Sequence, residues 1–368
     1  MKIGIAGYSN TGKTTIFNAL TKGTIETAAY ASASAEPHIG MVKVPDKRIE
    51  ELTRVHKPKK VTYEDVQYID IAGIAMGSAK DEKTVKVLSH IRDVDAIIQV
   101  ARGFSDENIV HVADTIDPIS DAKNFELELI LRDLELVENR LERIEHSIKR
   151  AATADKEVLN KEREVLTKCL AALEEESPLR QFEFDEDEIK VLNTYQFLSR
   201  SPEIVVVNAD EDDLNSEKLE NVESELIKYY EGKNTAVTSI CAKIEEEIAQ
   251  LSDEEAALFL EDLQIKEPAL DKLIHLSYKL LGLMPFFTVG VDEVRAWTIK
   301  KNTTAAKAAG KIHSDIERGF IRAEVISYDD YMSVDYNMVK AKEKGLVRLE
   351  GKSYIMQDGD IVNFRFNV

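Results

Sequence analysis

Residues suited to binding phosphate lie near the start of the chain, where positions 7–14 read GYSNTGKT and fit G-x-x-x-x-G-K-[ST]. A short apolar run precedes this stretch and an amphipathic run follows it, so we expect a strand, a glycine-rich loop and a helix. The backbone N–H groups of such a loop, together with the helix N-terminus, bind an anion. Lys13 would reach the β- and γ-phosphates of a nucleotide, and the Thr14 hydroxyl would bind Mg²⁺. An incidental glycine turn is disfavoured by this context, and a Rossmann dehydrogenase by the missing G-x-G-x-x-G.

A second set of candidate residues, DIAG at positions 70–73, fits D-x-x-G roughly 55 residues after the phosphate-binding loop. An apolar run over 61–71 predicts one strand or two, which would place Asp70 at a carboxyl end. There the Asp70 carboxylate would reach the magnesium shell, and the Gly73 N–H would approach the γ-phosphate. The motif alone is usually a turn, but its position after a phosphate-binding loop favours nucleotide chemistry.

A third motif bears on the base of the nucleotide. The apolar run 204–207 predicts a buried strand, and Asn208-Ala209-Asp210-Glu211 follows it. Guanine-specific P-loop proteins carry N-K-x-D at this place, and its aspartate accepts two hydrogen bonds from guanine. Here Ala209 takes the lysine position and Glu211 the aspartate position. This departure weakens the case for GTP and strengthens the case for ATP, because backbone groups can bind adenine.

A further short apolar run over 236–238 precedes Cys241 and Ala242, where a second base-contacting loop is expected. Strands alternate with helices through 1–118 and 201–282. This alternation predicts one α/β domain with a doubly wound, mostly parallel sheet.

The segment 119–200 interrupts that alternation. Apolar residues at 3–4 spacing from Leu127 to Ile148, and at heptad spacing from Leu159 to Leu173, predict two long helices in an antiparallel hairpin. Such a hairpin is either structural or an arm for a partner, and the sequence leaves both open. Cys169 on its seam is expected to be a small core residue and not a reactive thiol.

The final segment, 283–368, has several short strand patterns around one helical pattern, which predicts a small mixed sheet packed on a helix. It carries 13 Lys+Arg against 12 Asp+Glu, whereas the other residues carry 35 against 56. The negative net charge of −20 therefore comes from residues 1–282, whereas the final segment is nearly neutral. Because an acidic surface repels RNA phosphates, any contact with RNA would be local.

Composition predicts a soluble globular protein, with 43% hydrophobic and 32% charged residues and no apolar run near the ~20 residues of a membrane span. The two cysteines, Cys169 and Cys241, lack the spacing of a disulfide framework or a metal site. The first residues enter a strand at once, which leaves no room for a signal peptide. We expect a cytoplasmic monomer with no membrane partner.

These motifs, in this order, resemble those of the YchF/Obg-like ATPase family. The residues that carry the resemblance are 7–15, 70–74, 208–211 and, in the tail, 287–290, 293–299, 312–313, 317–324 and 357–368. The resemblance covers essentially the whole chain and implies a TRAFAC-type P-loop NTPase domain, a coiled-coil insertion and a C-terminal TGS (β-grasp) domain. It further implies hydrolysis of ATP in preference to GTP, and association with ribosomes or RNA through the insertion and the TGS domain.

The resemblance also assigns roles to individual residues. Ile74 replaces the glutamine that follows D-x-x-G in Ras-like enzymes, and His111 matches the family's candidate for assisting the attacking water. The residue alone favours a structural histidine at His111, and the resemblance leaves both roles open. Asn10 matches the asparagine with which some such NTPases hold K⁺ beside the phosphates. Ser34 stands where the family has a magnesium-binding threonine, and 77–83 carries non-glycine residues where the family's switch II is glycine-rich.

Three groups of site residues follow. The expected nucleotide-binding residues are Asn10, Thr11, Gly12, Lys13, Thr14, Thr15, Asn208, Ala209, Glu211, Cys241 and Ala242. The expected catalytic residues are Lys13, Gly73 and His111, and the expected metal ligands are Thr14, Ser34 and Asp70. We predict a slow, Mg²⁺-dependent ATPase whose nucleotide state regulates binding to ribosomes or RNA, with K⁺ as a further candidate cofactor. The alternatives are a GTPase switch with the same machinery and a nucleotide-gated scaffold with little turnover.

Overall fold

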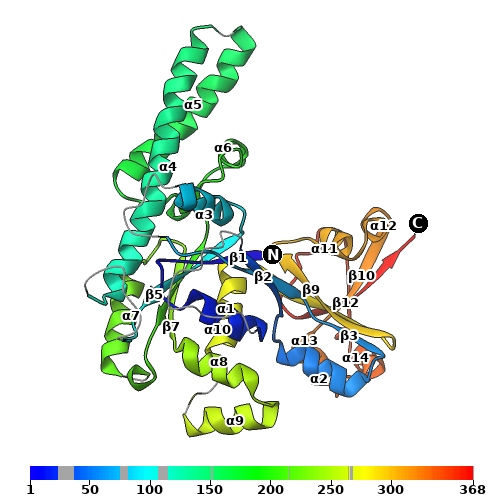
Figure 1. Cartoon of the computed structure of the whole chain (residues 1–368). Coiled ribbons are helices and arrows are strands. Elements are labelled where there is room, and N and C mark those ends of the chain that lie inside the picture. Colours follow the sequence, from blue (N-terminus) through cyan, green and yellow to red (C-terminus); the bar gives the residue numbers. More distant parts are fainter. Residues whose placement is uncertain are drawn as a thin grey trace. The chain divides into compact units, whose positions relative to one another are not determined.

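The computed structural model describes residues 1–23, 37–74, 82–106, 115–150, 152–214, 216–263, 265 and 268–367 (Figure 1). The chain forms two compact units, Met1–Val42 with Gln67–Leu273 and Lys43–Val66 with Ile274–Val368. The domain ranges expected from the sequence place 43–66 and 274–282 with the nucleotide-binding segments. The compact units instead group both stretches with the C-terminal sheet.

The sheet of the first unit has the strand order β2-β4-β1-β5-β6-β7. These strands are β1 (Lys2–Ala6), β2 (His38–Lys43), β4 (Asp65–Asp70), β5 (Ala96–Arg102), β6 (Glu203–Asn208) and β7 (Thr235–Ile240). Each neighbouring pair from β4 to β7 is parallel. The expected α/β class with a mostly parallel sheet is confirmed, and the carboxyl ends of β1, β4 and β6 lie along one edge.

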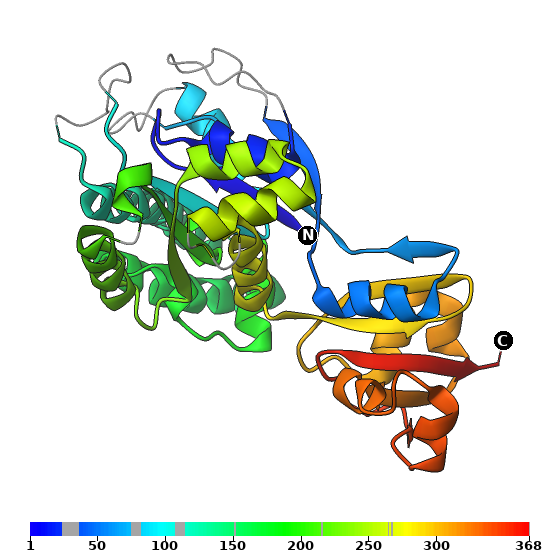
Figure 2. The same cartoon turned by 90° about the horizontal axis from the view of Figure 1, so that it is seen from below.

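Helices cover both faces of this sheet (Figure 2). Helices α1 (Lys13–Thr21) and α8 (Ala242–Gln250) pack together on one side. The other side is covered by α3 (Glu82–Arg92), α4 (Pro118–Ile148) and α7 (Glu217–Tyr229). Residues two apart along a strand point to the same face of the sheet. Ile97 and Gln99 of β5 both face α4, because Ile97 packs with apolar residues of α3 and α4 and Gln99 Nε2 donates to Ala122 O of α4 at 3.1 Å.

The acidic segment 244–262 forms two helices and not one continuous helix. It forms α8 and α9 (Asp253–Asp262), and the break between them comes from a capping box. The Glu255 N–H donates to Ser252 Oγ at 3.4 Å, and the Glu255 carboxylate accepts from the Ser252 N–H at 3.0 Å. Ser252 therefore begins a new helix where the apolar pattern alone indicates a continuous one.

The insertion is an antiparallel hairpin of α4 and α5 (Thr153–Glu174), as its periodicity predicts. Its seam is buried, with Val137, Ile144 and Leu166 fully inaccessible to solvent. Cys169 is also fully buried there, and burial raises the pKa of its thiol to about 11, which agrees with a core role. Among the helices that the structure describes, α4 included, none has the apolar length needed to cross a membrane.

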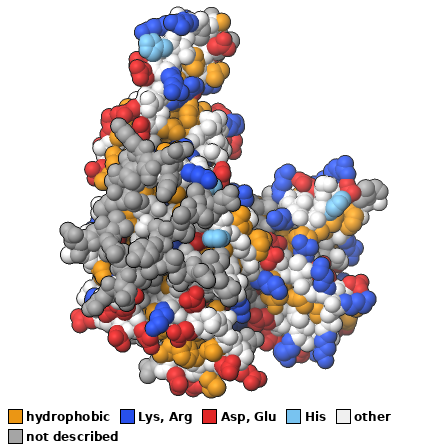
Figure 3. Space-filling model, in the orientation of Figure 1, with side chains coloured by type: hydrophobic (Ala, Val, Ile, Leu, Met, Phe, Trp, Pro, Cys, Tyr) orange, Lys and Arg blue, Asp and Glu red, His pale blue; other side chains and the backbone are white. Residues whose placement is uncertain are grey.

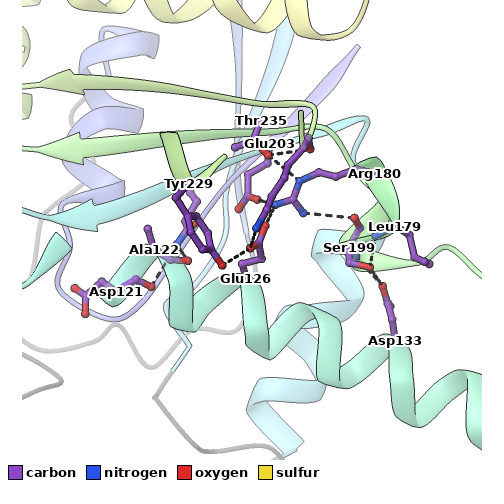
Figure 4. Close-up of polar contacts among 12 residues, drawn as sticks. Asp121, Ala122, Glu126, Asp133, Leu179, Arg180, Ser199, Glu203, Tyr229 and Thr235 are labelled. Carbon is purple, nitrogen blue, oxygen red and sulfur yellow. Dashed lines mark hydrogen bonds and ion pairs between the residues drawn. The ribbon is translucent and has the colours of Figure 1, made fainter. Parts of the chain in front are cut away.

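A buried cluster of charged side chains joins the hairpin to the sheet (Figure 4). The fully buried Arg180 guanidinium contacts the Glu126 carboxylate of α4 and, at 2.5 Å, the Glu203 carboxylate at the start of β6. Lys233 Nζ lies 3.3 Å from Glu126 Oε2. Burial raises the pKa of Glu203 to about 7; Arg180 lowers it, and the Glu126 carboxylate raises it further. The cluster connects α4 to the amino-terminal end of β6, and Asn208 lies at the other end of the same strand.

The second unit is built on a mixed sheet with the order β11-β10-β12-β8-β9-β3. Its strands are β3 (Lys60–Thr62), β8 (Leu283–Val289), β9 (Glu293–Lys300), β10 (Phe320–Ser327), β11 (Arg348–Glu350) and β12 (Asp360–Phe366). Helix α11 (Ala305–Ile312) packs on one face, as expected. The other face is covered by α2 (Lys47–His56), α13 (Tyr328–Met332) and α14 (Met338–Glu343), of which the last two were not expected.

The segment 43–66 belongs to this second sheet for two physical reasons. Strand β3 pairs in parallel with β9, so that Val61 lies opposite Val294. Helix α2 buries Ile49 and Leu52 completely against the sheet residue Phe287 and its neighbours. The segment follows β2 and precedes β4 in the chain, so the second unit is completed by residues that lie within the span of the first.

Candidate functional site

The phosphate-binding loop connects β1 to α1 and contains three residues with positive φ. The φ angles are 138° at Gly7, 63° at Asn10 and 92° at Gly12. A Cβ atom on Gly12 would lie 2.1 Å from Asn208 Nδ2, so only glycine allows the loop to approach Asn208 this closely. The Ile16 N–H donates to Gly12 O at 3.0 Å, so α1 begins directly at the loop and its first N–H groups border it. Thr15 lies half-buried in the first turn.

Lys13 is a buried cation of this loop. Its side chain is 7% exposed, and Nζ donates to Tyr8 O at 2.5 Å. Burial lowers the pKa of Lys13 to about 8, and the nearby Asp70 carboxylate acts in the opposite direction. A lysine with this pKa is mostly protonated at neutral pH, and a neighbouring phosphate would stabilise its charge. The geometry therefore suits Lys13 to the phosphate contact expected from the motif.

Thr14 and Asp70 meet across the two motifs. The Thr14 hydroxyl donates to Asp70 Oδ2 at 2.8 Å, and β4 delivers Asp70 opposite Ile5 of β1. Asp70 is 7% exposed, and burial raises the pKa of its carboxyl, while the Thr14 hydrogen bond and Lys13 lower it. A hydroxyl and a carboxylate oxygen are hard donors of the kind that Mg²⁺ prefers, so this pair fits a magnesium site that also uses nucleotide phosphates.

The D-x-x-G segment lies against the phosphate-binding loop. The Ile74 N–H donates to Gly7 O at 3.2 Å, and the Ser9 N–H donates to Ile74 O at 3.3 Å. A Cβ atom on Gly73 would lie 2.7 Å from Ser9 Cα and 2.9 Å from Ser9 N, so the close approach requires glycine. Ile74 is 2% exposed and packs in the core with Tyr8, which leaves it unable to orient a water molecule.

Asn208 connects the phosphate-binding loop with the base-binding segments. Its Nδ2 donates to Thr11 O at 3.0 Å, and its Oδ1 accepts from the Ala242 N–H at 3.0 Å. Ala209 and Cys241 are nearly fully buried, and the Ala209 N–H donates to Ile240 O at 2.8 Å. The structure therefore brings the asparagine of N-x-x-E together with both loops expected to surround a nucleotide.

The remaining base candidate, Glu211, lies at the start of a short 3₁₀ turn, Glu211–Asp213, and is exposed. Burial raises the pKa of the Cys241 thiol, so the contribution expected of Cys241 is its backbone and not a reactive sulfur. No side-chain hydrogen bond holds Glu211 to another described residue, which leaves its carboxylate free to reach a ligand.

Sequence reasoning missed the loop that follows β5. The Arg102 guanidinium lies 4.5 Å from the Phe104 ring centroid, and its Nε donates to Phe104 O at 3.1 Å. The Ser105 N–H donates to Asp210 Oδ2 at 2.8 Å, and the Gly103 N–H donates to Asn208 O at 2.8 Å. Phe104 thus lies at the same sheet edge as the base-binding segments. The sequence signal that could have identified Phe104 is its position shortly after a buried strand, the same position that Asn208 has.

Two expected site residues lie outside the described residues. These are Ser34, the expected magnesium ligand, and His111, the expected partner of the attacking water. Most of the switch II segment 77–83 lies outside them as well.

Comparisons with known proteins agree with this geometry. The family model described as "50S ribosome-binding GTPase" matches residues 2–140, and the YchF C-terminal model, described as "Protein of unknown function (DUF933)", matches residues 283–367. The "Ribosome-binding ATPase YchF" of Bacillus subtilis (strain 168) is 47% identical over 366 residues, which cover 99% of both chains. The protein of the same name from Pasteurella multocida (strain Pm70) is 44% identical over 369 residues, 100% of this chain and 99% of that one.

A solved structure is similar over nearly the whole fold. The "Structure of the Schizosaccharomyces pombe YchF GTPase" superposes with a TM-score of 0.84 at 32% sequence identity, covering 99% of this chain and 97% of that one. A phosphate-binding loop on β1, D-x-x-G on β4 and an asparagine motif on β6 define a P-loop nucleotide-binding protein of the GTPase-like class. With relatives matched over their full length, the chain belongs to the YchF family.

Proposed function

We propose that this chain is a Mg²⁺-dependent ATPase whose bound nucleotide controls its association with the ribosome. The observation that carries the proposal is that the phosphate-binding loop contacts both of the other motifs. Thr14 contacts Asp70 of D-x-x-G, and Thr11 contacts Asn208 of N-x-x-E. These contacts gather phosphate-, metal- and base-binding groups at one edge of the sheet. The names of the two bacterial relatives, each a "Ribosome-binding ATPase", support both halves of the proposal. We further expect a cytoplasmic monomer that contacts RNA through its insertion and its C-terminal domain.

The proposed chemistry is in-line attack of water on the γ-phosphate. Lys13 and the loop N–H groups stabilise negative charge on the phosphate oxygens, and the Gly73 N–H donates to the γ-phosphate. Thr14, Asp70 and Ser34 would hold Mg²⁺, which neutralises phosphate charge when bound. Because Ile74 is buried and apolar, we assign the orientation of water to His111.

The preference for ATP is proposed from the groups around the base. Ala209 lacks the lysine stem that covers guanine in N-K-x-D proteins, and Glu211 carries its carboxylate further out than aspartate would. Backbone groups near Asn208 and Ala242 can accept from the adenine amino group and donate to its ring nitrogen. The Phe104 ring offers an apolar surface on the same side of the sheet, since a Cβ atom on Gly12 would lie 3.8 Å from Phe104 Cε1.

Titration of the purified chain with labelled ATP and GTP tests this preference. We expect ATP to bind at least tenfold more tightly, and Lys13→Ala to abolish binding of both. The double variant Ala209→Lys with Glu211→Asp restores N-K-x-D and should shift the preference toward GTP. If GTP binds tenfold more tightly to the unmodified chain, the proposal of an ATPase is wrong.

Two alternatives have specific support. The name "YchF GTPase" of the Schizosaccharomyces pombe structure favours a GTPase switch, which the same titration distinguishes. The non-glycine residues Asp81 and Lys83 of switch II favour a nucleotide-gated scaffold with little turnover. Single-turnover hydrolysis with and without ribosomes separates this scaffold from an ATPase, because the scaffold would bind ATP without converting it.

We also propose that Asn10 supports a K⁺ ion beside the phosphates. Its left-handed backbone, with φ of 63°, lies within the loop that surrounds the phosphates. Hydrolysis should then be faster in K⁺ than in Na⁺, and Asn10→Ala should remove the difference without preventing ATP binding. Equal rates in the two salts would contradict this role.

A further inference from the structure

The helical insertion has an uneven distribution of charge. We define the hairpin tip as residues 143–163 and the hairpin stem as residues 119–142 and 164–200. The tip carries 6 Lys+Arg and 4 Asp+Glu, whereas the stem carries 7 Lys+Arg and 16 Asp+Glu. Figure 3 shows Lys, Arg and His side chains gathered at the far end of the hairpin. A net positive tip therefore stands on an acidic stem.

The basic side chains of the tip are exposed and differ from those of the stem in their pairing. Arg143, Lys149, Arg150 and Lys156 are exposed, and none of them forms an ion pair with a residue that the structure describes. In the stem, by contrast, six of the seven lysines and arginines pair with carboxylates, and the seventh, Arg200, donates to Asn193 Oδ1 at 2.9 Å. The stem pairs include Arg132–Glu135, Lys168–Glu188, Arg180–Glu126 and Lys190–Asp187. The tip alone in the insertion offers a group of cations without internal partners among the described residues.

The stem holds this group at the end of a stiff arm. Helix α4 has 31 residues, a length of roughly 46 Å. Where the stem meets the tip, Arg140 Nε of the stem donates to Glu162 Oε1 of the tip at 2.7 Å across the two helices. At the base, the Asp133 carboxylate accepts from the Leu198 and Ser199 N–H groups at 3.0 and 2.7 Å. An arm fixed along its length presents its end in a defined direction, which suits a contact with a large partner.

The chemistry of the tip identifies the class of partner. The chain has a net charge of −20, so a polyanion is repelled by most of its surface and attracted locally at the tip. The tip contains no Phe, Tyr or Trp, the side chains on which unpaired bases stack. It does contain several exposed cations along one short stretch, which can contact successive phosphates. These features favour the backbone of double-helical RNA over single-stranded RNA.

We propose that the hairpin tip binds the phosphate backbone of double-helical RNA on the ribosome. This inference rests on the proposed ribosome association and specifies the surface that makes the contact. Because phosphate contacts read no bases, the tip binds independently of RNA sequence and its affinity falls with salt. The nucleotide site is not part of this contact, so basal ATP hydrolysis does not depend on it.

A charge-reversal experiment on the full chain tests the proposal. The tip variant is Lys149→Glu, Arg150→Glu and Lys156→Glu. The matched control is Lys2→Glu, Lys228→Glu and Lys272→Glu, which reverses three exposed lysines elsewhere in the first unit and changes the net charge equally. Binding is measured by cosedimentation with ribosomes and by titration of a labelled RNA duplex, each at several KCl concentrations. Basal ATP hydrolysis reports whether each variant is folded.

The tip variant should bind both ribosomes and the duplex at least tenfold more weakly at low salt. Its plot of log affinity against log salt should be shallower by about 2 to 3, because each lost phosphate contact removes about 0.9 from the slope. The control should stay within about twofold of the unmodified chain. Equal losses in both variants would show that net charge, not the tip, governs binding, and unchanged binding of the tip variant would overturn the proposal.

Two further outcomes distinguish a failure of the assignment to RNA from a failure of the proposed ribosome association. If the tip variant loses ribosomes but binds the duplex normally, the tip contacts a ribosomal protein and the assignment to RNA is wrong. If the unmodified chain binds neither ribosomes nor the duplex, the proposed ribosome association itself fails.

Discussion

The Asn208 side-chain amide donates to Thr11 O at 3.0 Å and thereby joins the third motif to the phosphate-binding loop. Its carbonyl oxygen accepts from the Ala242 N–H at 3.0 Å, so one buried side chain fixes the distance between two loops. Nucleotide binding should depend on this side chain even if it never contacts the base.

We therefore predict that Asn208→Ala weakens ATP binding by about 10- to 100-fold, since each buried partner left without its hydrogen bond costs about 1–3 kcal/mol. Asn208→Asp is a second variant, because it keeps the oxygen that accepts from Ala242 but places a charged acceptor against Thr11 O. Its loss of ATP affinity should be at least as large as that of the alanine variant. Calorimetry measures both, and an alanine variant with unchanged affinity would contradict this positioning role.

A second prediction concerns the contact between Thr14 and Asp70. Thr14→Ala should lower the affinity for Mg²⁺ in the presence of ATP by about 10- to 100-fold, with a smaller effect on ATP binding without the metal. Thr14→Ser keeps the hydroxyl and should behave like the unmodified chain. Magnesium titrations of ATP hydrolysis provide the measurement, and equal magnesium dependence in all three proteins would exclude the role.

The pKa of Lys13 supplies a third prediction. Burial lowers it to about 8, and a bound phosphate raises it, so binding ATP above pH 8 requires uptake of a proton. The affinity for ATP should therefore be constant below pH 7 and fall above pH 8, approaching tenfold per pH unit. Calorimetry at pH 9 in buffers of different ionisation enthalpy should detect the proton uptake. Lys13→Arg, which stays charged, should lose the pH dependence.

The sequence predicts those parts of the fold whose signals are local. Residues 7–14 specify a phosphate-binding loop by residue type alone, and the apolar spacing from Leu127 to Ile148 predicts the first helix of the hairpin. Strand β3 could not be assigned to its sheet, because it has three residues and its partner β9 lies more than 200 residues further along the chain. A strand this short has no periodicity that names a partner.

The site shows the same division between local and tertiary signals. The motif identifies Asn208, but its bond to Thr11 spans 197 residues and depends on the parallel packing of the strands between them. Phe104 and Arg102 belong to no motif, and their loop meets Asn208 and Asp210 only once β5 and β6 are placed side by side. The break at Ser252 was detectable, since Ser and Glu three residues apart form a capping box.

The last prediction concerns the buried cluster at the base of the hairpin. Glu203 is fully buried beside Arg180, and burial raises its pKa to about 7 from an ordinary value of 4.5. The folded chain therefore binds this proton more tightly than the unfolded chain. As pH rises from about 4.5 to 7, the unfolded carboxyl ionises first, so the free energy of unfolding falls by up to about 3 kcal/mol and is constant above that range.

Glu203→Gln tests this linkage, because glutamine has nearly the same shape and does not ionise. Urea unfolding of both proteins between pH 5 and 8 gives the comparison, and the difference between them isolates Glu203 from other titrating groups. The unmodified chain should lose stability relative to the variant as pH rises through this range. Arg180 keeps its contacts with Glu126 and Thr235 in the variant, so the fold should persist. Parallel pH profiles for the two proteins would mean that Glu203 stays ionised throughout and that Arg180 outweighs its burial.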